Sequence, residues 1–289
     1  MGESSEQRQR QTGTSFDRLA YGADPFQYGE LYVPEGPGPH PVVALIHGGF
    51  WRKAYDLTLM QGLAQNLVAQ GIAAWNIEYR RIGNPGGAWP GTFLDVAAAT
   101  DYLNDLVPIY QLDLRRVVAV GHSAGGHLAC WLTCRHLLPS DSEINTSQTP
   151  LKLRGAISQA RVVDLEQAWQ LQLSQNVVQE LLRGSPSEQP ARYVQASPAA
   201  LLPSGTSQIL VHGSIDDVVP ISISRSYAHK ASAAGDNVSA TGTTGGRSLY
   251  TDRPQFRSLA THRKRDQTLD GLIRKPRIWT TQGIQIYNP

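Results

Sequence analysis

Ser123 lies in a glycine-rich run, from Gly121 to Gly125, whose spacing suits nucleophilic catalysis. The run follows an apolar stretch from Val117 to Val120 and precedes a helical pattern. Strand, sharp G-x-S-x-G turn and helix together make a nucleophile elbow, which holds a serine hydroxyl above the edge of a sheet. Glycines on both sides allow the tight backbone of such a turn. The sequence therefore predicts Ser123 as the nucleophile of acyl transfer, against the alternative of a chance match in a glycine-rich chain.

Backbone N–H groups that would stabilise a developing oxyanion are predicted on two segments. Gly48 and Gly49 follow a buried apolar run, and their missing side chains let an acyl oxygen approach the backbone. Ala124, directly after the nucleophile, would supply the second donor. The alternative is that the two glycines only make a tight turn. Phe50 and Trp51 would lie beside the acyl pocket, although aromatic side chains there fit a core equally well.

The orienting acid of the site is predicted to be Asp216. It stands just after a predicted strand and the turn at Gly213, and Val219-Pro220 then begins a helix. In open α/β sheets such a loop lies at the carboxyl edge, where Ser123 also emerges. Asp217 is the alternative acid, in which case Asp216 would cap the helix.

The elements that would position these residues alternate between strand and helix patterns. Strands are predicted over 27–33, 41–46, 72–79, 117–120, 153–158 and 207–212, and helices over 57–69, 92–106, 126–138 and 221–234. A helical insertion with several prolines is predicted over 163–203. The first strand is expected at an edge, whereas the continuous apolar run of the second indicates burial on both faces. The alternation predicts an α/β fold with a mainly parallel sheet covered by helices on both faces.

Length and composition fit one large soluble domain. The chain has 289 residues, of which 40% are hydrophobic and 17% charged, and no run of about 20 apolar residues predicts a membrane span. The first residues lack an apolar stretch, so we expect a disordered tail over 1–20 and no signal peptide. Cys130 and Cys134 lie on one predicted helix and suit buried thiols in a reducing, cytoplasmic setting. Because two sulfurs alone make a poor metal site, we expect no metal or other cofactor.

Three segments together resemble the α/β-hydrolases of the kynurenine formamidase (arylformamidase) and bacterial esterase-like group. They are the HGGFW run at 47–51, the elbow with its following glycine at 121–126, and the run HGSIDDVVP at 212–220. The HGGxW signature is more specific than the serine motif alone, and the similarity covers roughly residues 24–239. The resemblance implies the α/β-hydrolase fold, with Ser123 as nucleophile and Asp216 as acid. It also implies oxyanion donors near Gly49, Phe50 and Ala124.

The family pattern further requires a histidine roughly 30 positions after the acid, on a loop before the last helix. The sequence has no histidine there. The remaining candidates near the site are interpreted as structural histidines: His47, His122, His127, His212 and His229. His262 keeps the expected chain order and is the substitute base to test.

A shifted reading frame near Ala240 would explain the missing histidine. Up to Ala240 the chain has 17 basic and 21 acidic residues, a net charge of −4, but from Thr241 it has 9 and 3, a net charge of +6. Back-translation of residues 240–270 with chosen synonymous codons, read from the second base, yields a strand, a Pro-Gly turn, an Asp-His-Phe loop, an amphipathic helix and a stop codon. We therefore predict a hydrolase domain over 21–239 and an aberrant, disordered tail over 240–289, with the last strand and helix of the fold missing. The alternative is a genuinely divergent C-terminus.

The sequence thus predicts a serine hydrolase that cleaves a small-molecule ester or aryl formamide through an acyl-serine intermediate, with activity impaired by the absent histidine. Carboxylesterase and formamidase activities compete closely, and a serine peptidase is less favoured because no propeller-forming domain precedes the catalytic one. A different class is a catalytically inactive binding module of the same fold. The basic tail lacks a motif or interleaved aromatics, so we expect neither nucleic acid nor membrane as a partner. The sequence leaves the oligomeric state open.

Overall fold

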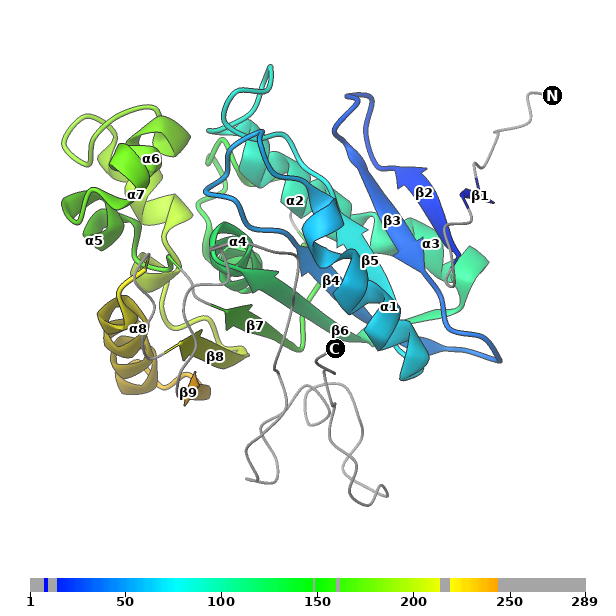
Figure 1. The fold of residues 1–289 in the computed structure, drawn as a ribbon. Helices are drawn as coiled ribbons and strands as arrows, with labels where there is room; N and C mark the ends of the chain where they lie inside the picture. The colour runs from blue at the N-terminus through cyan, green and yellow to red at the C-terminus, as the bar shows by residue number, and fades with distance from the viewer. Residues whose placement is uncertain (1–7, 10–14, 148, 160–161, 214–218, 244–289) are drawn as a thin grey trace.

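A nine-stranded sheet organises the part of the chain that the computed structural model describes, residues 8–9, 15–147, 149–159, 162–213 and 219–243. Its strand order is β1-β2-β3-β5-β4-β6-β7-β8-β9 (Figure 1). The strands are β1 (Arg8–Gln9), β2 (Phe16–Ala20), β3 (Tyr28–Tyr32), β4 (His40–Ile46), β5 (Ala73–Ile77), β6 (Leu112–His122), β7 (Gly155–Gln159), β8 (Ser207–Gly213) and β9 (Val238–Thr243). The pairs from β1 to β5 are antiparallel and those from β5 to β9 are parallel.

Helices cover both faces of this sheet. They are η1 (Leu57–Met60), α1 (Gln61–Ala69), α2 (Gly91–Asp101), α3 (Leu103–Tyr110), α4 (Ala124–Cys134), η2 (Arg135–Leu137), α5 (Leu165–Gln170), α6 (Leu173–Leu182), α7 (Pro190–Ala196), η3 (Pro198–Ala200) and α8 (Ile221–Ala233). Figure 1 shows α5, α6 and α7 grouped together at the upper left, on the opposite side of the view from β1 and β2.

Two hydrophobic clusters lie on opposite faces of the central strands. On β4, Val42, Ala44 and Ile46 belong to the cluster under α2, α3 and α4, whereas Val43 and Leu45 belong to the cluster under α1. Successive side chains of a strand point to opposite faces, so a continuous apolar run fills both cores. The mainly parallel α/β fold predicted from the sequence is therefore confirmed.

The N-terminal edge of the sheet differs from the prediction. Residues 16–20 were expected in a disordered tail, but they form β2, which pairs with β3. Consequently β3, expected at an edge, lies between β2 and β5. Phe16 is buried against Tyr32, and this contact between distant segments is what the local pattern could not reveal.

The C-terminal edge also extends further than expected. Strand β9 pairs in parallel with β8 and runs to Thr243, past the predicted domain end at residue 239. This corrects the expectation that the sheet ends before residue 240. The tail over 244–289, with the predicted loss of a last helix, lies outside the described residues.

Two smaller expectations concern α4 and membrane spans. Cys130 and Cys134 are buried on α4 and form no disulfide within the described residues, in agreement with the prediction of buried thiols. Among the described residues, no helix has the length and apolar character needed to cross a membrane.

Candidate active site

Ser123 occupies a strained turn between β6 and α4. Its backbone angles are φ 51° and ψ −118°, a conformation that side-chain-bearing residues rarely adopt. Its N–H donates to the Gln159 carbonyl at 2.7 Å, and its carbonyl accepts from the His127 N–H at 3.0 Å. The side chain is almost covered, at 4% exposure. Such strain persists only where surrounding bonds hold it, and it is common at active sites.

The glycines around Ser123 are required by close backbone contacts. A Cβ on Gly121 would lie 2.1 Å from the Gly125 carbonyl oxygen, and one on Gly126 would lie 2.3 Å from the Ser158 hydroxyl oxygen. A Cβ on Gly125 would lie 2.0 Å from the Ile46 carbonyl oxygen. Since real Cβ atoms do not come so close, this turn can be built only with glycine. The elbow expected from the sequence is therefore present in the backbone.

The predicted oxyanion loop begins beside the elbow. Ile46, the last residue of β4, pairs with Gly121 of β6, so the two parallel strands end at the same edge of the sheet. Beyond β4, three consecutive residues have positive φ: Gly49 at 110°, Phe50 at 53° and Trp51 at 54°. A Cβ on Gly49 would lie 2.4 Å from that of Tyr55, which explains why a glycine stands there. Gly48 is buried as well.

Ala124 is the first residue of α4 and is buried. The N–H of a first helical residue has no acceptor within its helix, and helix N-termini carry partial positive charge. The position therefore suits the second predicted oxyanion donor. The roles of Gly48, Gly49, Phe50 and Ala124 as donors remain proposals.

The two aromatic residues after the glycines have different surroundings. Phe50 is half-buried at the margin of the core. Trp51 is fully buried in the core and packs edge-on against His127, with ring centroids 5.3 Å apart. This burial matches the core alternative for Trp51 more closely than a place on an open acyl pocket.

The histidines near the site contact groups other than the Ser123 hydroxyl. His47 forms hydrogen bonds with the Gly48 carbonyl and with Glu78. His127 forms one with the Ala196 carbonyl. His212 forms hydrogen bonds with Ser224 and with the Val219 carbonyl. His122 is buried at the end of β6, and His229 is exposed on α8. Within the described ranges, no hydrogen bond joins an imidazole to the Ser123 hydroxyl. These contacts agree with the structural roles predicted for the histidines.

Burial lowers the pKa of His127 to about 4, although its bond to the Ala196 carbonyl opposes the shift. At neutral pH the ring is therefore uncharged. Because a carbonyl oxygen can only accept, the Nε2 atom carries the proton. His127 thus serves as a neutral packing residue one helical turn after Ser123.

Asp216, the alternative Asp217 and His262 lie outside the described residues. The strand before the predicted acid is in the expected place, since β8 lies parallel to β7, which in turn is parallel to β6. The carboxyl end of β8 consequently lies at the same edge of the sheet as that of β6, which precedes Ser123. Asp216 stays a prediction.

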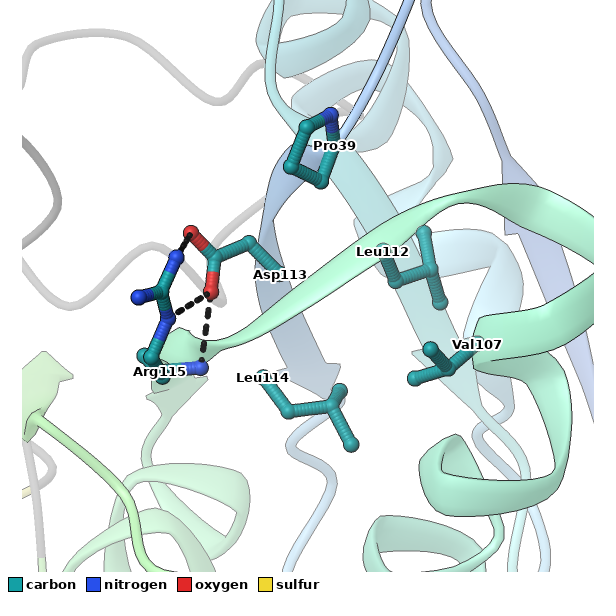
Figure 2. A pocket seen from close by; sticks show the side chains of 6 residues that line it. All are labelled: Pro39, Val107, Leu112, Asp113, Leu114 and Arg115. Atoms are coloured by element: carbon teal, nitrogen blue, oxygen red, sulfur yellow. Dashed lines mark hydrogen bonds and ion pairs between the residues drawn. The ribbon is translucent and has the colours of Figure 1, made fainter.

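A shallow hollow of about 430 Å³ lies at the opposite end of β6. Figure 2 shows its lining: Pro39, Val107, Leu112, Asp113, Leu114 and Arg115. Asp113 and Arg115 form an ion pair there, at 3.2 Å between carboxylate and guanidinium. Because β6 runs from Leu112 at this hollow to His122 beside the nucleophile, we assign the hollow no part in acyl transfer.

A sequence profile of the family BD-FAE, an α/β-hydrolase esterase family, matches residues 30–231, and the chain belongs to this family. It is 29% identical over 233 residues to the "Probable isoprenylcysteine alpha-carbonyl methylesterase ICME" of Oryza sativa subsp. japonica, covering 75% of this chain and 54% of that protein. It is also 29% identical over 237 residues to "Esterase LipC" of Mycobacterium tuberculosis, covering 75% and 55%. The chain thus spans about half the length of these curated relatives.

Solved structures share the fold at lower identity. A truncated carbohydrate esterase from gut microbiota superposes with a TM-score of 0.69 at 19% identity, covering 86% of this chain and 92% of that one. The propionate-bound esterase Est2 of Thermogutta terrifontis superposes with a TM-score of 0.66 at 20% identity, covering 81% and 85%. The family and the fold are thereby shown; the arylformamidase group expected from the sequence is a finer assignment.

Proposed function

We propose that this protein is a serine carboxylic-ester hydrolase whose nucleophile is Ser123. The observation that carries the proposal is the strained Ser123 turn, held beside the loop of positive-φ residues that follows β4. Membership of an esterase family supports the reaction class. Of the two relatives, one is named as a methylesterase and the other as an esterase, which favours an ester over an aryl formamide as the substrate.

In the proposed reaction, the Ser123 oxygen attacks the carbonyl carbon of the ester and gives up its proton to a base. The carbonyl electrons move to the oxygen, which accepts hydrogen bonds from the N–H groups of Gly49, Phe50 and Ala124. The C–O bond to the leaving group then breaks, and the alcohol departs with a proton. Water repeats the attack on the acyl-serine and releases the acid.

Removal of the proton from the Ser123 hydroxyl is the step for which this chain lacks the usual group. In this fold a histidine oriented by an acid, here the proposed Asp216, normally takes the serine proton. The family position for that histidine holds none, so the proton must pass to water or to a substitute such as His262. Loss of the histidine from a comparable serine hydrolase lowers kcat by roughly 10⁶. We therefore propose that the activity of this chain is impaired.

Acyl transfer is tested by following the mass of Ser123 rather than product alone. Incubation with p-nitrophenyl acetate or a fluorophosphonate should modify Ser123 slowly, and Ser123→Ala should abolish that modification. The exposed Ser222 is the internal control for non-specific reaction. Modification of Ser123 no faster than of Ser222 would exclude the esterase proposal and favour the catalytically inactive binding module.

Substrate class and the frame hypothesis need two further comparisons. A chain with the reading frame restored from Ala240 should react about 10⁵- to 10⁶-fold faster than the chain as it stands. Turnover of N-formylkynurenine against short acyl esters on that chain separates formamidase from carboxylesterase.

A His262→Ala change in the original chain should leave acylation unaltered, and a loss of acylation would identify His262 as the substitute base.

A further inference from the structure

His47 holds the peptide plane that carries a predicted oxyanion donor. Its Nδ1 lies 2.8 Å from the Gly48 carbonyl oxygen, and since a carbonyl only accepts, Nδ1 is the donor. The Gly48–Gly49 peptide is trans, so the Gly49 N–H points opposite to the Gly48 carbonyl. The bond from His47 therefore fixes the direction in which the Gly49 N–H points, away from the imidazole.

The His47 ring is in turn held by Glu78. Its Nε2 lies 3.2 Å from a Glu78 carboxylate oxygen. The ring of Tyr79 stacks on the imidazole, with the ring centroids 4.4 Å apart. Tyr79 also donates its hydroxyl to the His47 carbonyl at 2.9 Å. The two nitrogens of His47 thus face two oxygen atoms, that of the Gly48 carbonyl on one side and that of the Glu78 carboxylate on the other.

Glu78 is itself fully satisfied by partners. It accepts from the backbone N–H of Leu57 at 3.1 Å and of Tyr79 at 2.9 Å, and the Arg81 guanidinium lies 3.0 Å away. The side chains of His47, Glu78 and Arg81 are 0%, 1% and 2% exposed. Burial raises the pKa of Glu78. The hydrogen bond with His47 and the nearby His47 and Arg81 side chains lower this pKa by more than burial raises it, so the net shift is downward.

A cluster with only a structural role would not need the chain of contacts that runs from Glu78 through the His47 ring to the Gly48 carbonyl. An ion pair between Glu78 and Arg81 is complete without His47, yet Glu78 also contacts the imidazole, whose other nitrogen acts on the backbone of the predicted oxyanion loop. We propose that Glu78 is a positioning residue, which orients the Gly49 N–H toward the oxyanion through the His47 ring. This inference rests on the proposed function and adds to it a residue that touches neither substrate nor nucleophile.

The kinetic test compares Glu78→Ala and Glu78→Gln with the unmodified chain, using acylation of Ser123 by p-nitrophenyl acetate. Glu78→Ala should lower the maximal acylation rate by roughly 10- to 100-fold and leave the half-saturating ester concentration unchanged. Glu78→Gln should recover most of the rate, because an amide of equal length can still bond to Nε2. Asp101→Ala is the matched control, since it breaks the ion pair with Arg135, which involves no residue of the oxyanion loop. It should lower thermal stability without lowering the rate.

A spectroscopic readout decides the proposal even if the unmodified chain fails to acylate. The ¹³C shift of the Gly48 carbonyl and the amide shift of Gly49 report the His47 bond directly. Both should change in Glu78→Ala and stay near their original values in Glu78→Gln and Asp101→Ala. Unchanged shifts in Glu78→Ala would overturn the positioning role, whereas absent acylation of Ser123 in the unmodified chain would overturn only the proposed function.

Discussion

Gly125 packs so closely on Ile46 that a Cβ on the glycine would lie 2.0 Å from the Ile46 carbonyl oxygen and 2.5 Å from that of His47. The start of α4 and the end of β4 are therefore in direct backbone contact. This contact places the nucleophile turn against the predicted oxyanion loop, and it is possible only because position 125 has no side chain.

Replacement of Gly125 by alanine should disrupt both stability and the site. The clash is with backbone, which cannot move as a flexible side chain could, so we expect a loss of about 2–4 kcal/mol in the free energy of unfolding. Urea unfolding measures it. Gly62→Ala on α1 is the matched control, because a Cβ there meets nothing within 4 Å, and helix propensity favours alanine by about 0.5–1 kcal/mol. A mild effect of Gly125→Ala would show that the two segments can separate.

The strain at Ser123 can be measured by comparing two variants that both lack the hydroxyl. Glycine adopts φ 51° and ψ −118° without strain, whereas alanine, like serine, is strained in that conformation. After the entropy that glycine gains in the unfolded state is deducted, Ser123→Gly should be about 1 kcal/mol more stable than Ser123→Ala. Both should be inert to a fluorophosphonate. Equal stability of the two would mean that the turn is relaxed.

His127 should make stability depend on pH in the acid range. Its pKa is about 4 in the folded chain and about 6.5 unfolded, so below pH 6.5 only the unfolded state takes up the proton. Stability should be fully present above pH 6.5 and fall by up to about 1.4 kcal/mol per pH unit as the pH approaches 4. Urea unfolding at pH 7.5 and pH 5 should show a smaller decrease in His127→Gln than in the original chain. His136→Gln, at an exposed position, should keep the full decrease; identical pH dependence in all three chains would contradict the prediction.

Asp95 should be among the most sensitive buried charges. Its carboxylate accepts from the Arg80 backbone N–H and guanidinium at 2.7–2.9 Å and from the Gln27 amide at 2.8 Å, with no exposure to solvent. Asp95→Ala leaves those donors without their acceptor and should cost about 3–5 kcal/mol of unfolding free energy. The exposed Asp105 on α3 is the control, and Asp105→Ala should change stability by less than about 0.5 kcal/mol. A similar cost for both changes would contradict the assignment.

Much of the fold could be predicted because its signals are local. The run at 41–46 is apolar throughout, and the structure buries its residues in two cores on opposite faces. The helix predicted over 92–106 is interrupted at Tyr102 and divided into α2 and α3, since propensity alone does not place such a break. The elements β2 and β9 were missed because each depends on pairing with a strand elsewhere in the chain.

Glu78 shows what residue types alone could not reveal about the site. A charged residue directly after the buried β5 was a visible signal, but its partner could not be read from spacing. The parallel register, in which Ile46 pairs with Ile77, is what brings His47 beside Glu78. The oxyanion loop and its support therefore come from two strands whose alignment is a property of the sheet.

The sequence by itself determined the Ser123 elbow, the glycines after β4 and the alternation of strand and helix. These depend on the conformations available to single residues and on short-range periodicity, which a linear pattern expresses directly. Only the tertiary structure decided that Gly125 meets Ile46, that Trp51 belongs to the core, and that Glu78 orients His47. Each of those contacts joins segments far apart in the chain, and sheet register and packing alone bring them together.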